Sequence, residues 1–92
     1  MSFLWTLQTI IQERKASLQP GSYTASLLAA GEDEIVKKVD EEAVEVILAA
    51  KGQGDERLLS ETADVFYQVL VLLAQHGLTL EQVEAELERR HR

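Results

Sequence analysis

Apolar residues recur along this chain at intervals of three and four positions, the spacing of helices that bury one face. The chain has only one Pro and five Gly, so few places interrupt that spacing. The pattern predicts four helical segments, at residues 3–18, 32–51, 55–77 and 79–92, and a short capped turn over residues 22–28. No stretch alternates as a strand does. We therefore predict an all-α bundle of four to five helices, arranged around the hairpin of residues 32–77.

Residues that cap or break helices define the expected boundaries. Pro20-Gly21 is expected to end the first helix. Asp55 is expected to cap the helix that runs to residue 77. Thr79 and Gln82 form a capping box that begins the last, amphipathic helix. Three apolar residues of that helix are expected to face inward: Leu80, Val83 and Leu87.

The two helices of the hairpin differ in how their apolar residues are distributed. Residues 32–51 present one main apolar face, and Val44 and Leu48 form a separate arc that predicts contact with another helix or subunit. The main face comprises Ile35, Val39, Ala43, Val46, Ile47 and Ala50. Residues 55–77 are apolar around nearly the whole circumference, which predicts a helix buried on almost every side. Its narrow polar arc holds Glu61, Asp64 and Gln68.

Length and charge exclude several classes of function. The 92 residues are expected to form one small domain, residues 1–92. Sixteen acidic residues against nine basic ones give a net charge of −7, which disfavours nucleic-acid binding. No apolar run approaches the ~20 residues of a membrane span, and the absence of Cys excludes disulfides and thiol chemistry. We expect a cytoplasmic protein without an export leader, whose surplus of carboxylates requires an explanation.

Two pairs of acids at the same spacing lie on the two helices of the hairpin. Glu61 and Asp64 are three residues apart on the otherwise apolar helix, and Glu42 and Glu45 repeat this spacing on its partner. An antiparallel hairpin brings the two pairs face to face, where four carboxylates repel one another unless a cation binds. Mg²⁺ takes oxygen ligands and leaves positions for phosphates, so the pattern favours a Mg²⁺-dependent reaction of a polyphosphate. Lys38 either pairs with these acids or reaches a phosphate.

The same acids also have a purely structural interpretation, in which they form solvated surface. The acidic stripe of residues 34–45 is then paired locally by Lys37 and Lys38. The two acids of the apolar helix are then neutralised by a basic residue from a set of three: Arg14, Lys15 or Arg57. His76, near a helix end, is expected to partner the helix dipole, and His91 is expected to lie in a solvated basic tail.

Several runs of the sequence resemble one enzyme family over about residues 7–90. They are Ser22-Tyr23-Thr24, then Gly31, Ile35 and Lys38, then EEAVE at residues 41–45 and ETADVFYQVLVLL at residues 61–73. This set resembles phosphoribosyl-ATP pyrophosphatase, which belongs to the all-α nucleoside triphosphate pyrophosphatase superfamily of the MazG type. The EExxE and ExxD pattern is typical of the superfamily, and the SYT and ADxxY segments are typical of the histidine-pathway member.

The resemblance implies Mg²⁺-dependent hydrolysis of a small nucleotide, phosphoribosyl-ATP, to phosphoribosyl-AMP and pyrophosphate by a helical-bundle homodimer. This reaction is the second step of histidine biosynthesis. The resemblance implies four Mg²⁺ ligands: Glu42, Glu45, Glu61 and Asp64. It implies Glu41 as an outer acid or water-orienting base, and Lys38, Arg14 and Lys15 as groups that face the substrate phosphates. In many members of the family this domain is fused to a zinc-dependent cyclohydrolase; from the absence of Cys and the 92 residues we expect that this chain lacks that partner.

Two positions depart from the family pattern, and two other functions fit the same residues. Asp40 stands where Gly is frequent, and Gln68 stands where His is common. A glutamine can orient a water or a ligand but cannot act as a base. The first alternative function is a housekeeping pyrophosphatase for other nucleotides with the same metal motif. The second is a non-catalytic helical dimerisation module whose acids are solvated.

Overall fold

The computed structural model describes residues 2–91, and these residues form five helices joined by short connections. The helices are α1 (Phe3–Ser17), α2 (Tyr23–Ala30), α3 (Glu32–Gly52), α4 (Asp55–Gln75) and α5 (Leu80–Arg90). None of the described residues lies in a strand. The all-α prediction is therefore confirmed, and the segment predicted as a short turn after Pro20-Gly21 is an eight-residue helix, α2.

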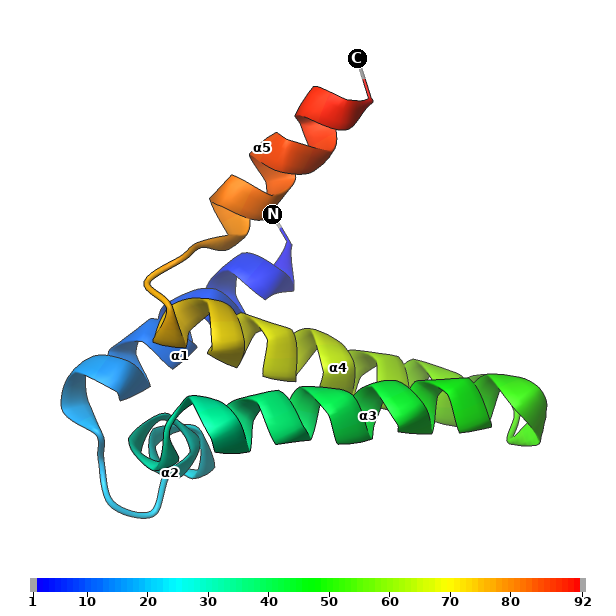
Figure 1. The fold of residues 1–92 in the computed structure, drawn as a ribbon, viewed down its shortest axis with the longest axis horizontal. Helices are drawn as coiled ribbons and strands as arrows, with labels where there is room; N and C mark the ends of the chain where they lie inside the picture. Colours follow the sequence, from blue (N-terminus) through cyan, green and yellow to red (C-terminus); the bar gives the residue numbers. More distant parts are fainter. Residues whose placement is uncertain (1, 92) are drawn as a thin grey trace.

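The long helices α3 and α4 run antiparallel, side by side, and form the body of the molecule (Figure 1). Helix α1 packs on α4, and α2 lies at the end of the hairpin where α3 begins. Helix α5 stands away from the hairpin (Figure 1). Among the described residues no single helix is long and apolar enough to cross a membrane; α4 and α5 pass that test only together, with a bend of 107° between them.

The hydrophobic core lies at the end of the hairpin that α1 and α2 cover. It is built from one or more buried residues of each of the first four helices: Ile11, Leu27, Ile35, Leu70, Val71 and Ala74. The other end of the hairpin extends beyond α1 and α2 (Figure 1). At that end, α3 and α4 therefore pack mainly against each other.

Capping explains most of the helix boundaries. The Ser22 hydroxyl accepts a hydrogen bond from the Ala25 N–H at the start of α2, and Thr79 and Gln82 form the predicted capping box of α5. The prediction that Asp55 caps α4 was wrong. The connection between α3 and α4 is so short that it needs a residue with positive φ, and Gly54 supplies it at 87°, so Asp55 is already helical.

The C-terminal ends of α1 and α4 also differ from their predicted positions. Helix α1 ends at Ser17, ahead of Pro20-Gly21, because Leu18 adopts a left-handed conformation with φ of 46°. Helix α4 ends at Gln75, and Gly77 follows it with φ of 71°. Each of these boundaries lies within three residues of its predicted position.

The expectation that α4 is buried on almost every side was wrong for the single chain. Leu59 is 71% exposed and Phe66 is 51% exposed, because α3, α1 and α2 together cover only part of the circumference of α4. Val83 and Leu87 of α5 are also exposed, against the prediction that they face inward, because α5 leaves the bundle. On α3, two residues of the predicted main face are exposed, Ile47 and Ala50.

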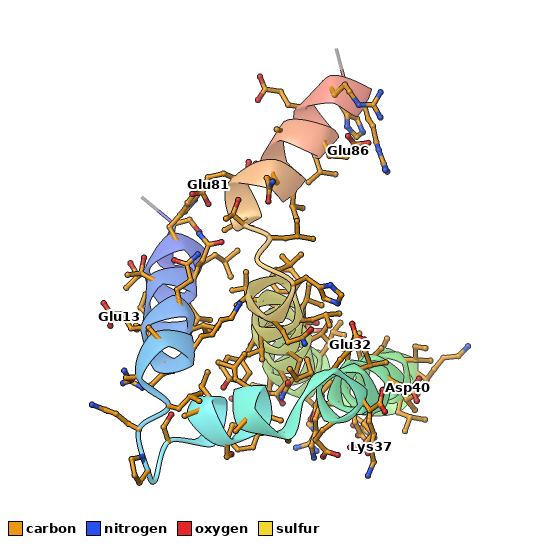
Figure 2. The ribbon with its side chains drawn as sticks, turned by 60° about the vertical axis from the view of Figure 1, so that its left-hand side comes forward. Glu13, Glu32, Lys37, Asp40, Glu81 and Glu86 are labelled. Atoms are coloured by element: carbon orange, nitrogen blue, oxygen red, sulfur yellow. The ribbon has the colours of Figure 1, made fainter. Side chains whose placement is uncertain are left out.

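A polar contact between α1 and the start of α5 sets the direction in which α5 leaves. The buried Gln8 accepts a hydrogen bond from the Leu80 N–H at 2.6 Å through its Oε1. Its Nε2 donates to Glu81 Oε1 at 2.8 Å, and Figure 2 shows Glu81 at the junction of the two helices. One glutamine thus holds the beginning of α5 against α1.

Candidate functional site

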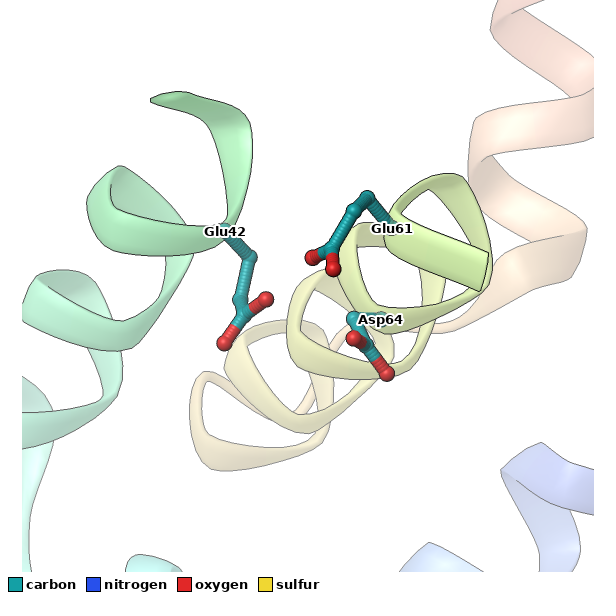
Figure 3. Close-up of side chains that lie close together, drawn as sticks. All are labelled: Glu42, Glu61 and Asp64. Atoms are coloured by element: carbon teal, nitrogen blue, oxygen red, sulfur yellow. The ribbon is translucent and has the colours of Figure 1, made fainter. Parts of the chain in front are cut away.

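Three carboxylates converge between α3 and α4, where the two helices pack against each other. One oxygen each from Glu42, Glu61 and Asp64 lies within 4.8 Å of the other two (Figure 3). Glu61 is buried, Glu42 is half-buried and Asp64 is exposed. The sequence prediction that acids from both helices of the hairpin meet is confirmed for these three residues. We call them the acid cluster.

Seven-residue spacing explains why acids lie on the packed faces of these helices. Ile35, Glu42 and Ala49 follow one another at this spacing on α3, and Ile35 and Ala49 are fully buried. Glu61 and Gln68 keep the same spacing on α4 and are 5% and 4% exposed. Residues seven apart return to the same helix face after two turns, so both helices present polar groups within their contact seam. This regular spacing was the signal in the sequence for the buried position of Gln68.

The negative charges of the acid cluster act on Glu42. Burial raises the pKa of Glu42 above its ordinary 4.5, and the negative charges of Asp64, Glu61 and Glu45 raise it further. Lys38 acts in the opposite direction and lowers this pKa. Without a bound cation Glu42 therefore keeps its proton to a higher pH than an ordinary glutamate does.

One arginine neutralises part of the acid cluster, as the structural interpretation of these acids required. Arg57 Nε lies 3.1 Å from Glu61 Oε1, four residues away on α4. Among the described residues no other cation lies within 4.0 Å of the three clustered carboxylates. Three carboxylates thus share one partner charge. Hard divalent cations prefer carboxylate oxygens, and an excess of carboxylates in a partly buried cluster fits such an ion.

Two other acids of α3 lie outside the acid cluster. Glu45 is one turn beyond Glu42, and its charge reaches Glu42, but its carboxylate is not among the three that converge. Glu41 pairs with two neighbours on α3: Lys37 Nζ and Lys38 Nζ lie 3.9 Å and 3.6 Å from its carboxylate oxygens. This local pairing is the one expected for a solvated helix face.

The basic residues predicted to face phosphates lie on different parts of the molecule. Lys38 is half-buried on α3, one turn before Glu42. Lys15 donates to the Ala74 carbonyl at 2.7 Å, near the end of α4, about 15 Å along the helix from Asp64. Arg14, its neighbour on α1, forms no ion pair within residues 2–91. The phosphate-binding role of these residues stays a prediction.

A second polar group adjoins the acid cluster where α2 packs on α4. The Tyr67 hydroxyl is hydrogen-bonded to Thr24, and burial raises its pKa above 10.0, so it stays protonated at neutral pH. The Tyr23 ring stacks on the Tyr67 ring with centroids 6.3 Å apart. Gln68 donates through Nε2 to Tyr23 Oη at 3.4 Å. Sequence reasoning placed Gln68 on the polar arc of α4 but missed its contact with α2, because that contact is tertiary.

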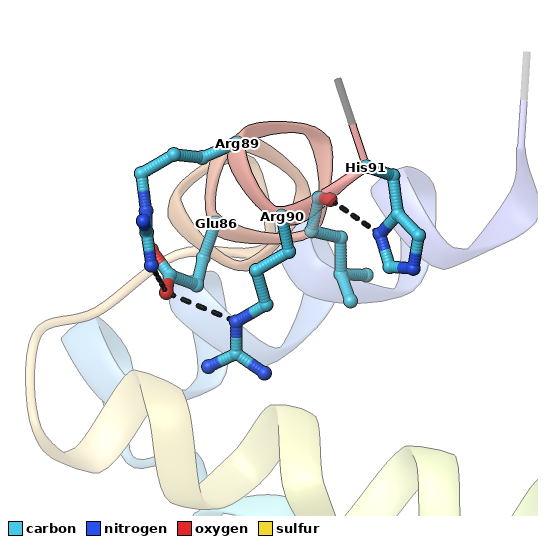
Figure 4. Close-up of polar contacts among 5 residues, drawn as sticks. Glu86, Arg89, Arg90 and His91 are labelled. Atoms are coloured by element: carbon cyan, nitrogen blue, oxygen red, sulfur yellow. Dashed lines mark hydrogen bonds and ion pairs between the residues drawn. The ribbon is translucent and has the colours of Figure 1, made fainter.

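The two histidines make contacts away from the acid cluster. His76 follows the end of α4, and its ring pairs with Glu32 at the beginning of α3. His91 contacts the Leu87 carbonyl, and Figure 4 shows its neighbours Arg89 and Arg90 both pairing with Glu86. Those two arginines lower the pKa of the Glu86 carboxyl. The basic tail is thus paired within α5, as expected for solvated surface; Arg92 lies outside the described residues.

Comparison with known proteins places these residues in a family. A family model described as phosphoribosyl-ATP pyrophosphohydrolase matches residues 4–91. A protein named phosphoribosyl-ATP pyrophosphatase from Lactiplantibacillus plantarum is 50% identical over 84 residues, which are 91% of this chain and 79% of that protein. A protein of the same name from Metallosphaera sedula is also 50% identical over 84 residues, 91% of this chain and 90% of that protein.

A longer relative contains the same region as part of its chain. The histidine biosynthesis bifunctional protein HisIE of Halalkalibacterium halodurans is 48% identical over 87 residues, which are 95% of this chain and 41% of that protein. The family model and the single-function relatives both extend over nearly the whole chain, including the acid cluster. This chain belongs to the phosphoribosyl-ATP pyrophosphohydrolase family.

Proposed function

We propose that this chain hydrolyses phosphoribosyl-ATP to phosphoribosyl-AMP and pyrophosphate, the second step of histidine biosynthesis. The reaction breaks the anhydride bond between the α and β phosphates, and water is added across the broken bond. One observation carries the proposal: Glu42, Glu61 and Asp64 converge within a chain that matches this family over residues 4–91. The activity implies a cytoplasmic location, where the nucleotide substrate is available.

Magnesium is the proposed cofactor, and the acid cluster is its proposed site. Glu42, Glu61 and Asp64 would hold the ion, and Glu45 would reach it by a change of side-chain conformer. When bound, Mg²⁺ supplies neutralising charge for the triphosphate and polarises the phosphorus–oxygen bonds. The carboxylates themselves keep the site anionic, so a nucleotide binds there only together with its cation.

Two side chains beside the acid cluster have proposed roles toward substrate. Lys38 lies one turn from Glu42 and would pair with a phosphate oxygen. Glu41 would orient the attacking water or accept its proton. Lys38 and Glu41 pair with each other at 3.6 Å, so substrate binding at Lys38 would leave Lys37, at 3.9 Å, as the remaining partner of Glu41.

The proposed active form is a homodimer, because the single chain exposes more surface than a compact monomer of its size. Its accessible surface is 6353 Å², whereas the size scaling for monomers of 10.3 kDa gives about 5,350 Å². The difference of about 1,000 Å² resembles the roughly 800 Å² that each partner buries in a stable protein complex. The radius of gyration, 14.2 Å, also exceeds the about 12 Å of a compact 92-residue domain.

The surface proposed to receive the second copy is the apolar groove between α4 and α5. It consists of two adjoining hollows of about 250 and 300 Å³, which share Leu73 and Val83. Phe66 and Val69 line the first hollow, and Leu87 lines the second. A two-fold axis along this groove would bury the same apolar side chains of both copies.

The proposed activity is tested by pyrophosphate release from phosphoribosyl-ATP with Mg²⁺, with a chelator control. Release that the chelator abolishes is the expected result. A panel of nucleoside and deoxynucleoside triphosphates distinguishes the housekeeping alternative, which requires faster release from one of them than from phosphoribosyl-ATP. A chain that releases no pyrophosphate and whose melting temperature does not change with Mg²⁺ would be the non-catalytic module, since a ligand of the native state must stabilise it.

A further inference from the structure

Gln68 lies beside the acid cluster and is not used by the proposed hydrolysis. It follows Asp64 by one turn of α4, so the two residues share a helix face about 6 Å apart along the axis. The residue is 4% exposed. Its Nε2 donates to Tyr23 Oη at 3.4 Å, whereas its Oε1 is buried and has no hydrogen-bond partner within residues 2–91.

A buried amide with one unpaired end is unfavourable for folding, because that end loses its water and gains no partner. Reversing the amide does not remove this cost, since the NH₂ group would then lack an acceptor. A leucine would occupy a similar volume at this position without any polar group to satisfy. The amide therefore costs stability in the free chain, and a ligand that offers a hydrogen-bond donor would remove that cost.

The tyrosines next to Gln68 form the rest of a nucleoside-sized contact surface. Thr24 holds the Tyr67 hydroxyl, so the Tyr67 ring has a fixed position under α2. Tyr23 stacks on that ring and is itself 53% exposed. A fixed, partly exposed aromatic ring is a surface on which a nucleobase stacks. The hydroxyl of the same tyrosine contacts Gln68, so the ring and the unpaired amide oxygen belong to one group.

We propose that Gln68, together with Tyr23, recognises the nucleoside portion of the substrate. Gln68 Oε1 accepts a hydrogen bond from an N–H or O–H donor of that portion, and Tyr23 packs against the base. The inference rests on the proposed function, because phosphates at the acid cluster bring the nucleoside one helical turn further along α4. Gln68 is then a residue that determines specificity and has no part in bond cleavage.

Gln75 provides a matched control on the same helix. Its Oε1 is also buried without a partner among the described residues, but its side chain is only half-buried. It lies 11 residues beyond Asp64, about 16 Å along the axis, out of reach of a nucleoside whose phosphates are at the acid cluster. Gln68→Leu and Gln75→Leu therefore make the same chemical change at two distances from the proposed site.

The first measurement is kcat/KM for phosphoribosyl-ATP in the wild type and both variants. We expect a loss of about tenfold for Gln68→Leu, the effect of one lost hydrogen bond, and a change within about twofold for Gln75→Leu. The melting temperature of Gln68→Leu should equal or exceed that of the wild type. If the wild type is active and Gln68→Leu has the same kcat/KM, the inference is overturned and the proposed function still stands.

The second measurement identifies the donor and separates this inference from the proposed function. The dissociation constants of AMP and its 2′-deoxy, 3′-deoxy and 6-deamino analogues are measured with Mg²⁺. In the wild type the analogue that lacks the donor should bind about tenfold more weakly than AMP, and in Gln68→Leu all four should bind alike. Equal binding of all four to the wild type contradicts the inference. If the wild type discriminates among the four nucleotides as expected but releases no pyrophosphate from phosphoribosyl-ATP, the proposed function is overturned and the inference about Gln68 stands.

Discussion

Arg57 and Glu61 form an ion pair with one buried and one exposed end. The Arg57 Nε lies 3.1 Å from Glu61 Oε1, and the two side chains are 56% and 7% exposed. A buried carboxylate is costly when it has no partner, so this arginine offsets part of the charge of the acid cluster in the metal-free chain. A cation that binds the cluster must compete with it.

Arg57→Gln should therefore destabilise the metal-free chain and increase its response to Mg²⁺. We expect the melting temperature in chelator to fall by about 4–8 °C, corresponding to about 1 kcal/mol, a modest value because Arg57 is half-exposed. The rise in melting temperature on adding Mg²⁺ should be larger than in the wild type. Arg89→Gln, which removes a charge from an exposed pair on α5, is the control and should leave the Mg²⁺ response unchanged. A smaller Mg²⁺ response in Arg57→Gln would contradict the competition.

Glu42→Gln should abolish hydrolysis and stabilise the metal-free chain at neutral pH. The pKa of Glu42 is raised, so the folded chain holds this proton more tightly than the unfolded chain does. Stability that depends on the proton is present in acid and is lost as pH rises through the folded-state pKa, so ionised Glu42 destabilises the chain at neutral pH. Glutamine carries no such charge. Thermal melts in chelator across the acid-to-neutral range measure the difference, which should vanish in acid.

Asp40→Asn is the matched control for this substitution, because Asp40 is an exposed acid on the same helix. Figure 2 shows it on α3 among the labelled charged residues. The Asp40→Asn variant should keep its Mg²⁺ response and its activity. It therefore measures separately any general effect of removing one negative charge from α3. Glu42→Gln with wild-type activity would remove Glu42 from the proposed metal ligands.

Mg²⁺ binding should weaken on acidification at a higher pH than an ordinary glutamate would cause. Metal ligands must lose their protons to bind, and the raised pKa of Glu42 moves this requirement above the usual 4.5. The stabilisation by a fixed Mg²⁺ concentration, measured by thermal melts at decreasing pH, should therefore begin to decline at a higher pH than an ordinary glutamate ligand would cause. A response that persists down to the ordinary glutamate range would show that Glu42 does not bind the ion.

The backbone boundaries could be predicted from the sequence because they depend on local chemistry. The capping box at Thr79 and the hydroxyl cap at Ser22 act within four residues of the chain, and both are present. The meeting of Glu42 with Glu61 also follows from sequence, because a short connection forces two long helices antiparallel. Asp55 was misplaced as a cap, since its role depended on the backbone conformation of Gly54, which composition does not specify.

Contacts between distant segments could not be predicted in the same way. The hydrogen bond of Gln68 with Tyr23 joins residues 45 positions apart, and no periodicity links them. The exposure of Phe66 was mispredicted for a different reason. An apolar helix surface indicates burial but does not say whether the cover comes from the same chain or from another copy.

Phe66→Glu should dissociate the proposed homodimer. A charge in the middle of an apolar interface must lose its water without gaining a partner, so we expect the dissociation constant to rise at least about a hundredfold. Sedimentation or light scattering over a concentration series measures this. Val44→Glu makes the same change on the exposed arc of α3 and is the comparison. Dissociation by Val44→Glu and not by Phe66→Glu would move the interface to α3.

The two faces of α4 should also respond to different kinds of selection. Glu61 and Gln68 are buried polar residues, whereas Leu59 and Phe66 are apolar residues exposed on a single chain. In a library of α4 variants, sorting for cellular abundance would enrich apolar substitutions at the first pair and deplete polar ones at the second. Sorting for growth without histidine would reject changes at both. The difference between the two sorts would mark, along one helix, where folding stability has been given up for chemistry.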